Sequence, residues 1–168
     1  HNAMNALAAC AVAWKSGIPG DVTARALAQF HGAGRRMEYK GQYNGADIYD
    51  DYAHHPGEMH ALLAAARMMG YQRIICAFQP HTYTRTRALF DDFVRELKTV
   101  DLPVLTDIYA ARESNTVGVS AQDLAAQIPG SVYCPSLQDV TAFLRRTAQP
   151  GDLMLTVGAG DIYKAGDN

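Results

Sequence analysis

Residues 73–78 read "RIICAF", an arginine followed by five consecutive apolar residues. A run of this length is typical of a short strand that is buried on both faces. The segments on either side, residues 57–69 and 86–100, carry helical patterns. A buried strand between two helices predicts a parallel sheet that helices cover on both faces.

The same alternation continues to the end of the chain. Ser120 is a suitable N-cap for the first of the later helices, because its hydroxyl can accept a bond from a free backbone N–H. Further strands are predicted at residues 102–108, 131–134 and 152–158, and further helices at residues 120–128 and 136–148. The order predicts an α/β fold with a Rossmann-like, mostly parallel sheet.

A different pattern precedes Pro56. Residues 37–52 contain two tyrosine-bearing alternating runs separated by Asn44-Gly45, which predicts a β-hairpin. Two helices are predicted before this hairpin, at residues 4–16 and 22–30, the second with Asp21 as its N-cap. The hairpin therefore begins the sheet, and the two helices form a separate preceding element.

Composition narrows the class of protein. The chain has 168 residues, 48% of them hydrophobic and 19% charged, with a formal charge of -2, so nonspecific binding to nucleic acid has no electrostatic support. Its three cysteines form no CxxC pair, which argues against a disulfide scaffold and fits a reducing cytoplasm. No apolar run approaches the roughly 18 residues of a membrane span. We therefore expect a cytoplasmic protein with neither nucleic acid nor membrane as a partner.

Polar segments follow the predicted strands. They read "DDYAHHP" at residues 50–56, "QPHTYTR" at 79–85, "DIYAARE" at 107–113 and "GAGD" at 158–161. Ligands of open parallel sheets collect at the carboxyl ends of the strands, so these segments are expected to form one site.

The histidines suggest a metal site as one alternative. His54, His55, Glu58 and His60 lie within seven positions, and imidazole with carboxylate suits zinc or iron. Pro56 is expected to begin a helix, however, so the histidines before it diverge, and His60 has no histidine partner one turn later.

Nucleotide binding and carboxylate binding are the other two alternatives. "GAGD" and "HGAGRR" are glycine-rich but complete no phosphate-binding motif, although Arg35 and Arg36 could bind phosphate. Arg85 follows a predicted strand and could hold a small carboxylate with two parallel hydrogen bonds, while a nearby neutral His or Tyr orients an amine. Spacing alone leaves Arg85 and Arg87 equally compatible with a solvated helix face.

Taken together and in order, these motifs resemble the Mur ligases, and within them the alanine-adding branch. The resemblance covers essentially the whole chain and rests on "HNAMNALAA", "GAGRRMEY", "DDYAHHPGE", "FQPHTYTRTR", "DIYAARE" and "LTVGAGDIY". It implies that residues 1–36 end a central ATPase domain and that residues 37–168 form the C-terminal domain of a three-domain enzyme. The chain is then expected to be a fragment that is inactive without the N-terminal domain and the rest of the central domain.

The resemblance also implies an activity and roles for individual residues. The implied enzyme is an ATP-dependent ligase that joins L-alanine to UDP-N-acetylmuramate through an acyl phosphate. Its Mg²⁺ ligands lie outside this chain, which is expected to contribute no metal ligand. His54 and Arg85 are expected to be catalytic. The expected contacts to L-alanine are Tyr52, His54 and Arg85, and those to ATP are His1, Asn2, Asn5, Arg36 and Asp51.

The chain departs from the family pattern at Thr82, where many members carry an arginine. A hydroxyl cannot replace a charge, so Arg85 is expected to bind the carboxylate with less help. Two other functions remain open at this stage: a muropeptide recycling ligase that adds a preformed tripeptide, and a nucleotide-binding module without turnover. The acceptor separates the first from the alanine-adding ligase, and tight ATP binding by this chain alone would favour the second.

Overall fold

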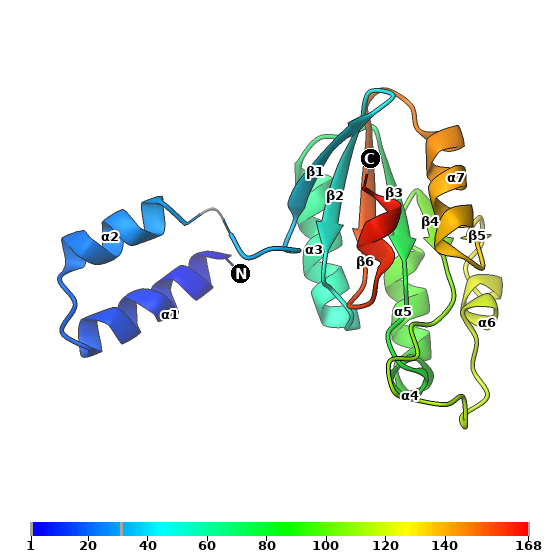
Figure 1. Cartoon of the computed structure of the whole chain (residues 1–168), viewed down its shortest axis with the longest axis horizontal. Coiled ribbons are helices and arrows are strands. Elements are labelled where there is room, and N and C mark those ends of the chain that lie inside the picture. Colours follow the sequence, from blue (N-terminus) through cyan, green and yellow to red (C-terminus); the bar gives the residue numbers. More distant parts are fainter. Residues whose placement is uncertain (1, 31, 168) are drawn as a thin grey trace. The chain divides into compact units, whose positions relative to one another are not determined.

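A computed structural model describes residues 2–30 and 32–167 (Figure 1). Their contacts divide the chain into two units, His1–Ala33 and Gly34–Asn168. The assignment of residues 1–36 to a central ATPase domain stays a prediction. No helix in the described ranges is long and apolar enough to cross a bilayer.

The first unit is a pair of helices, α1 (Asn2–Lys15) and α2 (Gly20–Ala28). The prediction that Asp21 caps α2 is wrong: the N-cap is Pro19, and Asp21 lies in the first turn, where it pairs with Arg25 at 2.7 Å. Proline fixes the φ that suits an N-cap residue, and the helix begins two residues earlier than predicted. Large apolar side chains of this unit are exposed, namely those of Met4, Leu7, Val12, Trp14, Ile18, Val22 and Phe30.

The second unit is built on a six-stranded sheet in the order β1-β2-β6-β3-β4-β5. The strands are β1 (Glu38–Tyr43), β2 (Ala46–Asp51), β3 (Arg73–Phe78), β4 (Leu102–Leu105), β5 (Val132–Tyr133) and β6 (Asp152–Val157). Strands β1 and β2 are antiparallel, and every other pairing in the sheet is parallel. The predicted mostly parallel sheet with an N-terminal hairpin is confirmed.

The hairpin turn follows from its two central residues. Asn44 and Gly45 have φ values of 49° and 78°, the left-handed pair of a type I′ turn, which matches the twist of the strands. The Asn44 side-chain amide also donates to the backbone oxygen of Ala148 at 2.7 Å, which fixes the turn against the rest of the unit.

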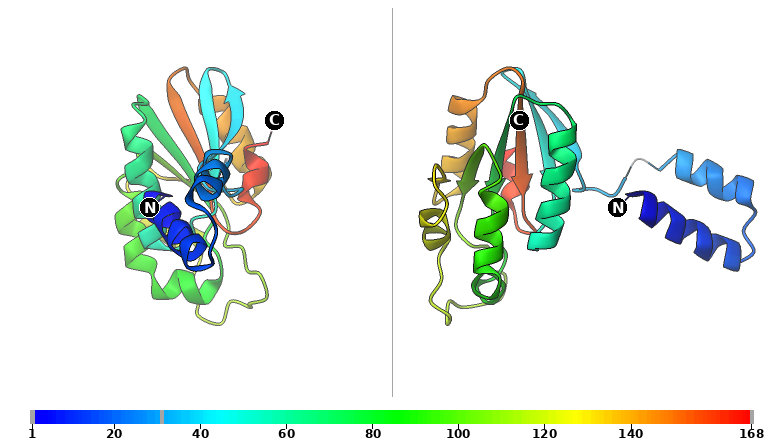
Figure 2. Two further views of the ribbon diagram at one scale, coloured as in Figure 1. Left: turned by 90° about the vertical axis from the view of Figure 1, so that its left-hand side faces the viewer. Right: turned by 180° about the vertical axis from the view of Figure 1, so that it is seen from behind.

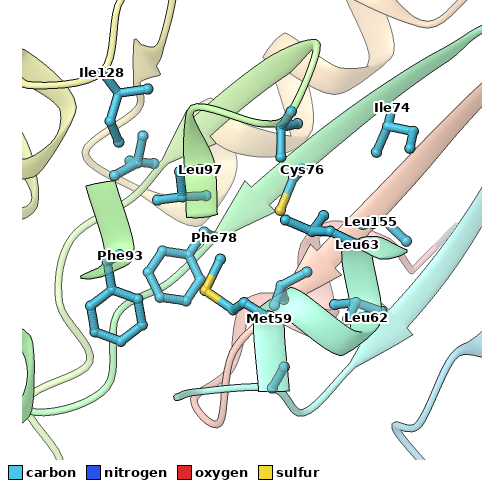
Figure 3. Packing of buried hydrophobic residues seen from close by; sticks show 14 of the residues in the cluster. Met59, Leu62, Leu63, Ile74, Cys76, Phe78, Phe93, Leu97, Ile128 and Leu155 are labelled. Atoms are coloured by element: carbon cyan, nitrogen blue, oxygen red, sulfur yellow. The ribbon is translucent and has the colours of Figure 1, made fainter. Parts of the chain in front are cut away.

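Helices cover both faces of the sheet (Figures 1 and 2). They are α3 (Pro56–Met68), α4 (Tyr83–Ala88), α5 (Phe90–Leu97), α6 (Ala121–Ala126), α7 (Leu137–Thr147) and the short 3-10 helix η1 (Ile162–Ala165). The side chains of β3 alternate between the faces: Cys76 and Phe78 pack with α3 and α5, whereas Ile75 and Ala77 pack with α7 and η1. Figure 3 shows the first of these cores, in which Met59 of α3 and Phe93 of α5 lie on either side of Phe78. Burial of each of the large side chains, such as Ile75 and Phe78, stabilises the fold by about 1.5–3 kcal/mol.

One predicted helix is divided in two. The single helix expected at residues 86–100 is α4 followed by α5, because Leu89 has φ -114° and ψ 21° and so leaves the helical conformation. Leu89 and Phe90 then turn toward the core formed with α3. The break gives α4, which carries Arg85, a direction of its own. The predicted Ser120 cap is confirmed as a full capping box with Asp123.

Candidate functional site

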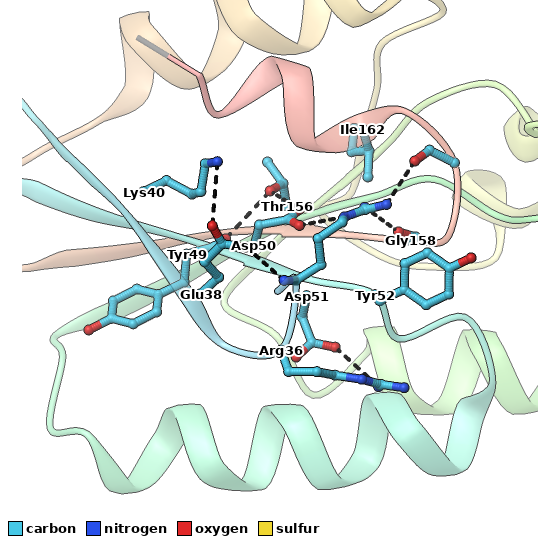
Figure 4. A network of polar contacts seen from close by, with 12 residues as sticks. Arg36, Glu38, Lys40, Tyr49, Asp50, Asp51, Tyr52, Thr156, Gly158 and Ile162 are labelled. Carbon is cyan, nitrogen blue, oxygen red and sulfur yellow. Dashed lines mark hydrogen bonds and ion pairs between the residues drawn. The ribbon is translucent and has the colours of Figure 1, made fainter. Parts of the chain in front are cut away.

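Asp51 is the last residue of β2, so it lies at the end of the sheet where the parallel strands finish (Figure 4). One carboxylate oxygen accepts from the Met37 backbone N–H at 2.9 Å and the other from that of Ala53 at 2.8 Å, and the side chain is 8% exposed. Burial raises the pKa of Asp51 above its usual value, against the opposing effect of these two amides and of Arg36. The carboxylate is therefore held in one orientation by the chain that enters the unit.

Arg36 extends from the entering segment over Asp51 and α3. Its guanidinium lies 4.0 Å from the Asp51 carboxylate and 3.8 Å from that of Glu58, and its side chain is 49% exposed. These contacts are long, so Arg36 retains donors that could bind an anionic ligand.

His54 follows the end of β2 and lies beside the first turn of α3. Its ring nitrogen Nδ1 lies 3.0 Å from the Tyr52 backbone oxygen and 3.4 Å from the Glu58 carboxylate. Burial raises the pKa of Glu58, but the His54 backbone N–H and the charges of His54 and Arg36 outweigh it, so the pKa lies below its ordinary value. Glu58 is thus an ionised acceptor that orients both His54 and Arg36.

His81 connects the loops that follow β2, β3 and β4. Its ring stacks on Tyr109 with centroids 5.6 Å apart, and the centroid of the His54 ring lies 6.2 Å from that of His81. His54 is in turn packed edge-on against Tyr52, with centroids 5.4 Å apart. A row of four rings therefore joins residues from three separate loops.

Arg85 joins this row through His81. Its guanidinium nitrogen lies 3.5 Å from His81 Nδ1, since the two residues are one turn apart across the start of α4. Burial, the charge of Arg85 and the proximity of His54 lower the pKa of His81, whereas Glu113 opposes the shift. The imidazole beside Arg85 is consequently neutral at pH 7 and can accept or donate a hydrogen bond.

The backbone at Thr82 gives α4 its starting direction. Thr82 has φ 66° and ψ 144°, a left-handed conformation that is costly for a β-branched residue. Its N–H donates to the Tyr109 backbone oxygen at 2.9 Å, and its backbone oxygen accepts from the Thr86 hydroxyl at 2.7 Å. These bonds hold the strained residue in place.

The "GAGD" segment follows β6, the strand that lies between β2 and β3 in the sheet. The Gln79 side-chain amide donates to Asp161 and its oxygen accepts from the Ile162 N–H, each at 3.1 Å. A Cβ atom on Gly160 would meet the Tyr109 ring at 2.7 Å, so only glycine permits this approach. The glycines of this segment therefore serve close packing against the residues that hold His81.

The structure does not gather the histidines into a metal site. His55 caps α3, where its ring accepts from the Gly57 N–H at 3.2 Å, and His60 pairs with Glu96 of α5 at 3.0 Å. Within residues 2–30 and 32–167, no group of three or more His, Cys, Asp or Glu side chains could hold a metal ion.

The predicted ATP contacts fall on both units. Asn5 is exposed on α1 and Asn2 is the first residue of that helix, whereas His1 lies outside the described residues. Arg36 and Asp51 belong to the second unit and lie together there. The contacts of Asn2 and Asn5 with ATP stay predictions.

The second unit brings the predicted L-alanine contacts together, with Tyr52 and His54 adjoining and Arg85 linked to them through His81. Two members of the cluster, His81 and Tyr109, are absent from the predicted site. Both stand in the quoted motifs, and the signal that could identify them is their shared position just after neighbouring strands. Nearby in the segment after β4, Asp107 accepts from the Tyr133 hydroxyl, and Glu113 accepts from the backbone N–H and the hydroxyl of Thr84.

Residues 35–160 match the family model described as Mur ligase, glutamate ligase domain. The chain is 44% identical over 171 residues to the UDP-N-acetylmuramate–L-alanine ligase of Clostridium novyi (strain NT), an alignment that covers 99% of this chain and 37% of that protein. It is 43% identical to the ligase of the same name from Agathobacter rectalis, with 100% of this chain and 38% of that protein covered. The chain thus spans less than two fifths of the length of these relatives.

Two solved structures share the fold. The UDP-N-acetylmuramate-alanine ligase of Thermotoga maritima has a TM-score of 0.79 at 24% identity, covering 99% of this chain and 36% of that one. A murein peptide ligase of Psychrobacter arcticus has a TM-score of 0.70, also at 24% identity, covering 98% of this chain and 35% of that one. At this identity the likeness concerns the fold, and it extends over nearly the whole chain.

Proposed function

This chain belongs to the Mur ligase family, and from that premise we propose that it is the C-terminal part of a UDP-N-acetylmuramate–L-alanine ligase. The observation that carries the proposal is the position of Arg85 beside a neutral His81 at the carboxyl edge of the sheet. A fixed cation next to a neutral imidazole suits a small zwitterion, whose carboxylate and amine need opposite kinds of partner.

The proposed reaction forms one amide bond with ATP as the energy source. ATP transfers its terminal phosphoryl group to the carboxylate of UDP-N-acetylmuramate, which gives ADP and an acyl phosphate. The amine of L-alanine attacks the acyl carbon, the C–O bond to phosphate breaks, and phosphate leaves with its electron pair while the nitrogen loses a proton. The whole protein carries out this reaction, and this chain contributes the acceptor site.

Arg85 is proposed to bind the L-alanine carboxylate. Its guanidinium has five N–H donors, and the long contact to His81 leaves donors for a bidentate bond. With Thr82 at the start of α4, this arginine acts without a second charge from that position. Tyr52 is proposed to form the wall of the pocket that faces the small side chain.

His54 and His81 are proposed to position the amine of the acceptor. Only the unprotonated amine is a nucleophile, and a neutral imidazole can accept one of its hydrogens while it is aligned with the acyl carbon. His54 is the catalytic imidazole of the proposal, oriented by the ionised carboxylate of Glu58. The ring of His81, whose centroid lies 6.2 Å from that of His54, is proposed to help position the same amine.

The part of the chain near Asp51 fits one end of ATP. Arg36 has donors free for phosphate oxygens, and Asp51 has acceptor positions beyond its two amides that a ribose hydroxyl could use. His1, Asn2 and Asn5 are proposed as further ligands of the nucleotide in the whole protein. Mg²⁺, which would neutralise phosphate charge, is proposed to be held by residues outside this chain, in the N-terminal or central part of the protein.

A cytoplasmic location belongs to the same proposal. It is supported by the three cysteines, which are all free, with Cys76 and Cys134 buried as reduced thiols.

The test uses the whole protein that carries this chain. Phosphate release is measured with ATP, UDP-N-acetylmuramate and either L-alanine, L-serine, glycine or a preformed L-alanyl tripeptide. The proposal predicts release that depends on L-alanine and is weak with the other acceptors. Preference for the tripeptide would assign the chain to a recycling ligase instead, an alternative supported by the fold shared with the murein peptide ligase.

A further inference from the structure

Arg35 and Arg36 are adjacent, yet the structure separates their surroundings. Arg36 is 49% exposed and its ionic contacts are long, whereas the Arg35 side chain is 23% exposed and all three nitrogens of its guanidinium donate hydrogen bonds. Its Nε donates to Asp50 at 2.7 Å, and its two terminal nitrogens donate to the Gly158 and Gly160 backbone oxygens at 2.7 and 3.1 Å. Each nitrogen of the Arg35 guanidinium is therefore engaged within the protein itself.

The Arg35 guanidinium also lies over two tyrosine rings. Its central carbon lies 4.9 Å from the centroid of the Tyr52 ring and 4.7 Å from that of Tyr163. Both distances fall within the range in which a cation is attracted to an aromatic face. Figure 4 shows Tyr52 alongside this network, next to Gly158.

The network below Arg35 is buried and complete. Asp50 is 1% exposed, and its second carboxylate oxygen accepts from the Thr156 hydroxyl at 2.7 Å. Arg35 supplies the positive charge that this buried carboxylate needs. The position of Arg35 is thus fixed by Asp50 of β2, which is itself bonded to Thr156 of β6.

The backbone conformation around Arg35 also indicates that this segment is held in place by several contacts. Arg35 and Met37 have φ values of 58° and 45°, left-handed conformations that are uncommon for residues other than glycine. Such strain persists only where several contacts hold it, and here the Arg35 N–H bonds Glu38 while the Arg35 backbone oxygen accepts from the Tyr52 N–H at 2.7 Å. The entering segment is therefore bonded directly to the backbone of Tyr52.

We propose that Arg35 is a positioning residue for the acceptor pocket, because it holds both of the pocket's walls. One wall is Tyr52, which Arg35 supports through its ring and its backbone. The other is the segment 158–160, which Arg35 binds through two carbonyls and which packs against Tyr109, the residue stacked on His81. This inference rests on the proposed function only for the identity of the acceptor.

The first test measures position directly, on this chain, by the ring resonances of its tyrosines and histidines in NMR spectra. Arg35→Lys keeps the charge beside Asp50 but removes the planar fork and the stacking face. We expect the resonances of Tyr52, His54 and His81 to shift, while that of His60, which pairs with Glu96, stays in place. Tyr163→Leu, which removes one stacking face, should move the same resonances, and Tyr163→Phe, which keeps it, should not. Unchanged pocket resonances in Arg35→Lys would overturn the inference.

The second test compares the two arginines in the whole protein. Arg35→Lys is expected to raise the KM for L-alanine about tenfold with a change of less than about twofold in the KM for ATP, since a displaced pocket weakens binding of the acceptor alone. Arg36→Lys is expected to do the reverse. A loss of stability alone would lower the amount of active enzyme without changing the ratio of the two KM values. An equal rise in the KM for ATP would show that Arg35 is a phosphate ligand and would overturn the proposal. If the whole protein does not use L-alanine, the proposed function fails, and the resonances still decide the role of Arg35.

Discussion

The ring of His81 stacks on the ring of Tyr109, with centroids 5.6 Å apart and planes inclined by 20°. The two residues follow different strands and are also joined by their backbones, since the Tyr109 N–H donates to the Pro80 oxygen at 2.8 Å and the Thr82 N–H donates to the Tyr109 oxygen at 2.9 Å. The loops after β3 and β4 are therefore bonded to each other just before α4, the helix that carries Arg85. The proposed acceptor site depends on this fixed pair of loops.

Replacing Arg85 by alanine in the whole protein should separate the two substrates. The KM for L-alanine is expected to rise by about 100-fold, the loss of a charge-assisted bidentate contact, while the KM for ATP stays within about twofold. The measurement is initial-rate phosphate release at varied L-alanine and then at varied ATP. Arg87→Ala is the matched control, because Arg87 is exposed on the same short helix and is expected to change neither constant. Equal increases in both constants for Arg85→Ala would contradict the carboxylate role.

His81 should make the second unit less stable in acid. Burial, Arg85 and His54 lower its pKa in the folded state, so as the pH falls through the ordinary value near 6.5 the unfolded chain takes up a proton first. The unfolded state then binds more protons than the folded state, and the free energy of unfolding falls as the pH falls below about 6.5. Urea unfolding at pH 7.5 and 5.5 measures this loss, which His81→Gln should reduce. A larger loss in the variant than in the original chain would show that the imidazole is stabilised in its charged form.

Gly160→Ala should disturb the site through Tyr109. An added Cβ would meet the Tyr109 ring at 2.7 Å and would also collide with the Gln79 side chain, so the ring must move away from its place beside His81. We expect a loss of about 1–3 kcal/mol in the free energy of unfolding and a raised KM for L-alanine. Gly57→Ala is the control, since its Cβ would make an ordinary 3.6 Å contact with His55 in the first turn of α3. A Gly160→Ala protein with unchanged stability and kinetics would show that Tyr109 does not need its present position.

The strands were predictable because their signal is local. The run "RIICAF" is the full extent of β3, and five consecutive apolar residues between two helical segments are typical of a short strand covered on both sides. The division of the helix at Leu89 was not predictable in the same way. The sequence around Leu89 favours a helix, and only packing of Leu89 and Phe90 against the core outweighs that preference.

The site was predictable at the level of its loops and less so at the level of its contacts. Parallel strands bring their carboxyl ends to one edge, so the convergence of His54 and Arg85 follows from the order of elements. The contacts that join them both involve His81, whose place beside Tyr109 depends on the conformation of Thr82, which no residue preference suggests. Which of Arg35 and Arg36 is bonded within the protein and which is exposed likewise depends on which side chain packs against Asp50.

Arg73 provides a test that stability and acceptor binding are separable, because it lies at the amino end of β3, the opposite end from the site. Its guanidinium bonds both carboxylate oxygens of Asp152, at 2.9 and 2.6 Å, and that carboxylate is only 4% exposed. Arg73→Met would leave a buried charge without its partner, and we expect the free energy of unfolding to fall by about 3 kcal/mol. Arg95→Met breaks a pair of similar length with Asp92, but the Arg95 side chain is 65% exposed, so a much smaller loss than for Arg73→Met is expected. Urea unfolding compares the two variants, and the KM for L-alanine should be unchanged in both. Similar losses would mean that solvent already screens the Arg73 pair, and a raised KM would mean that the two ends of β3 are coupled.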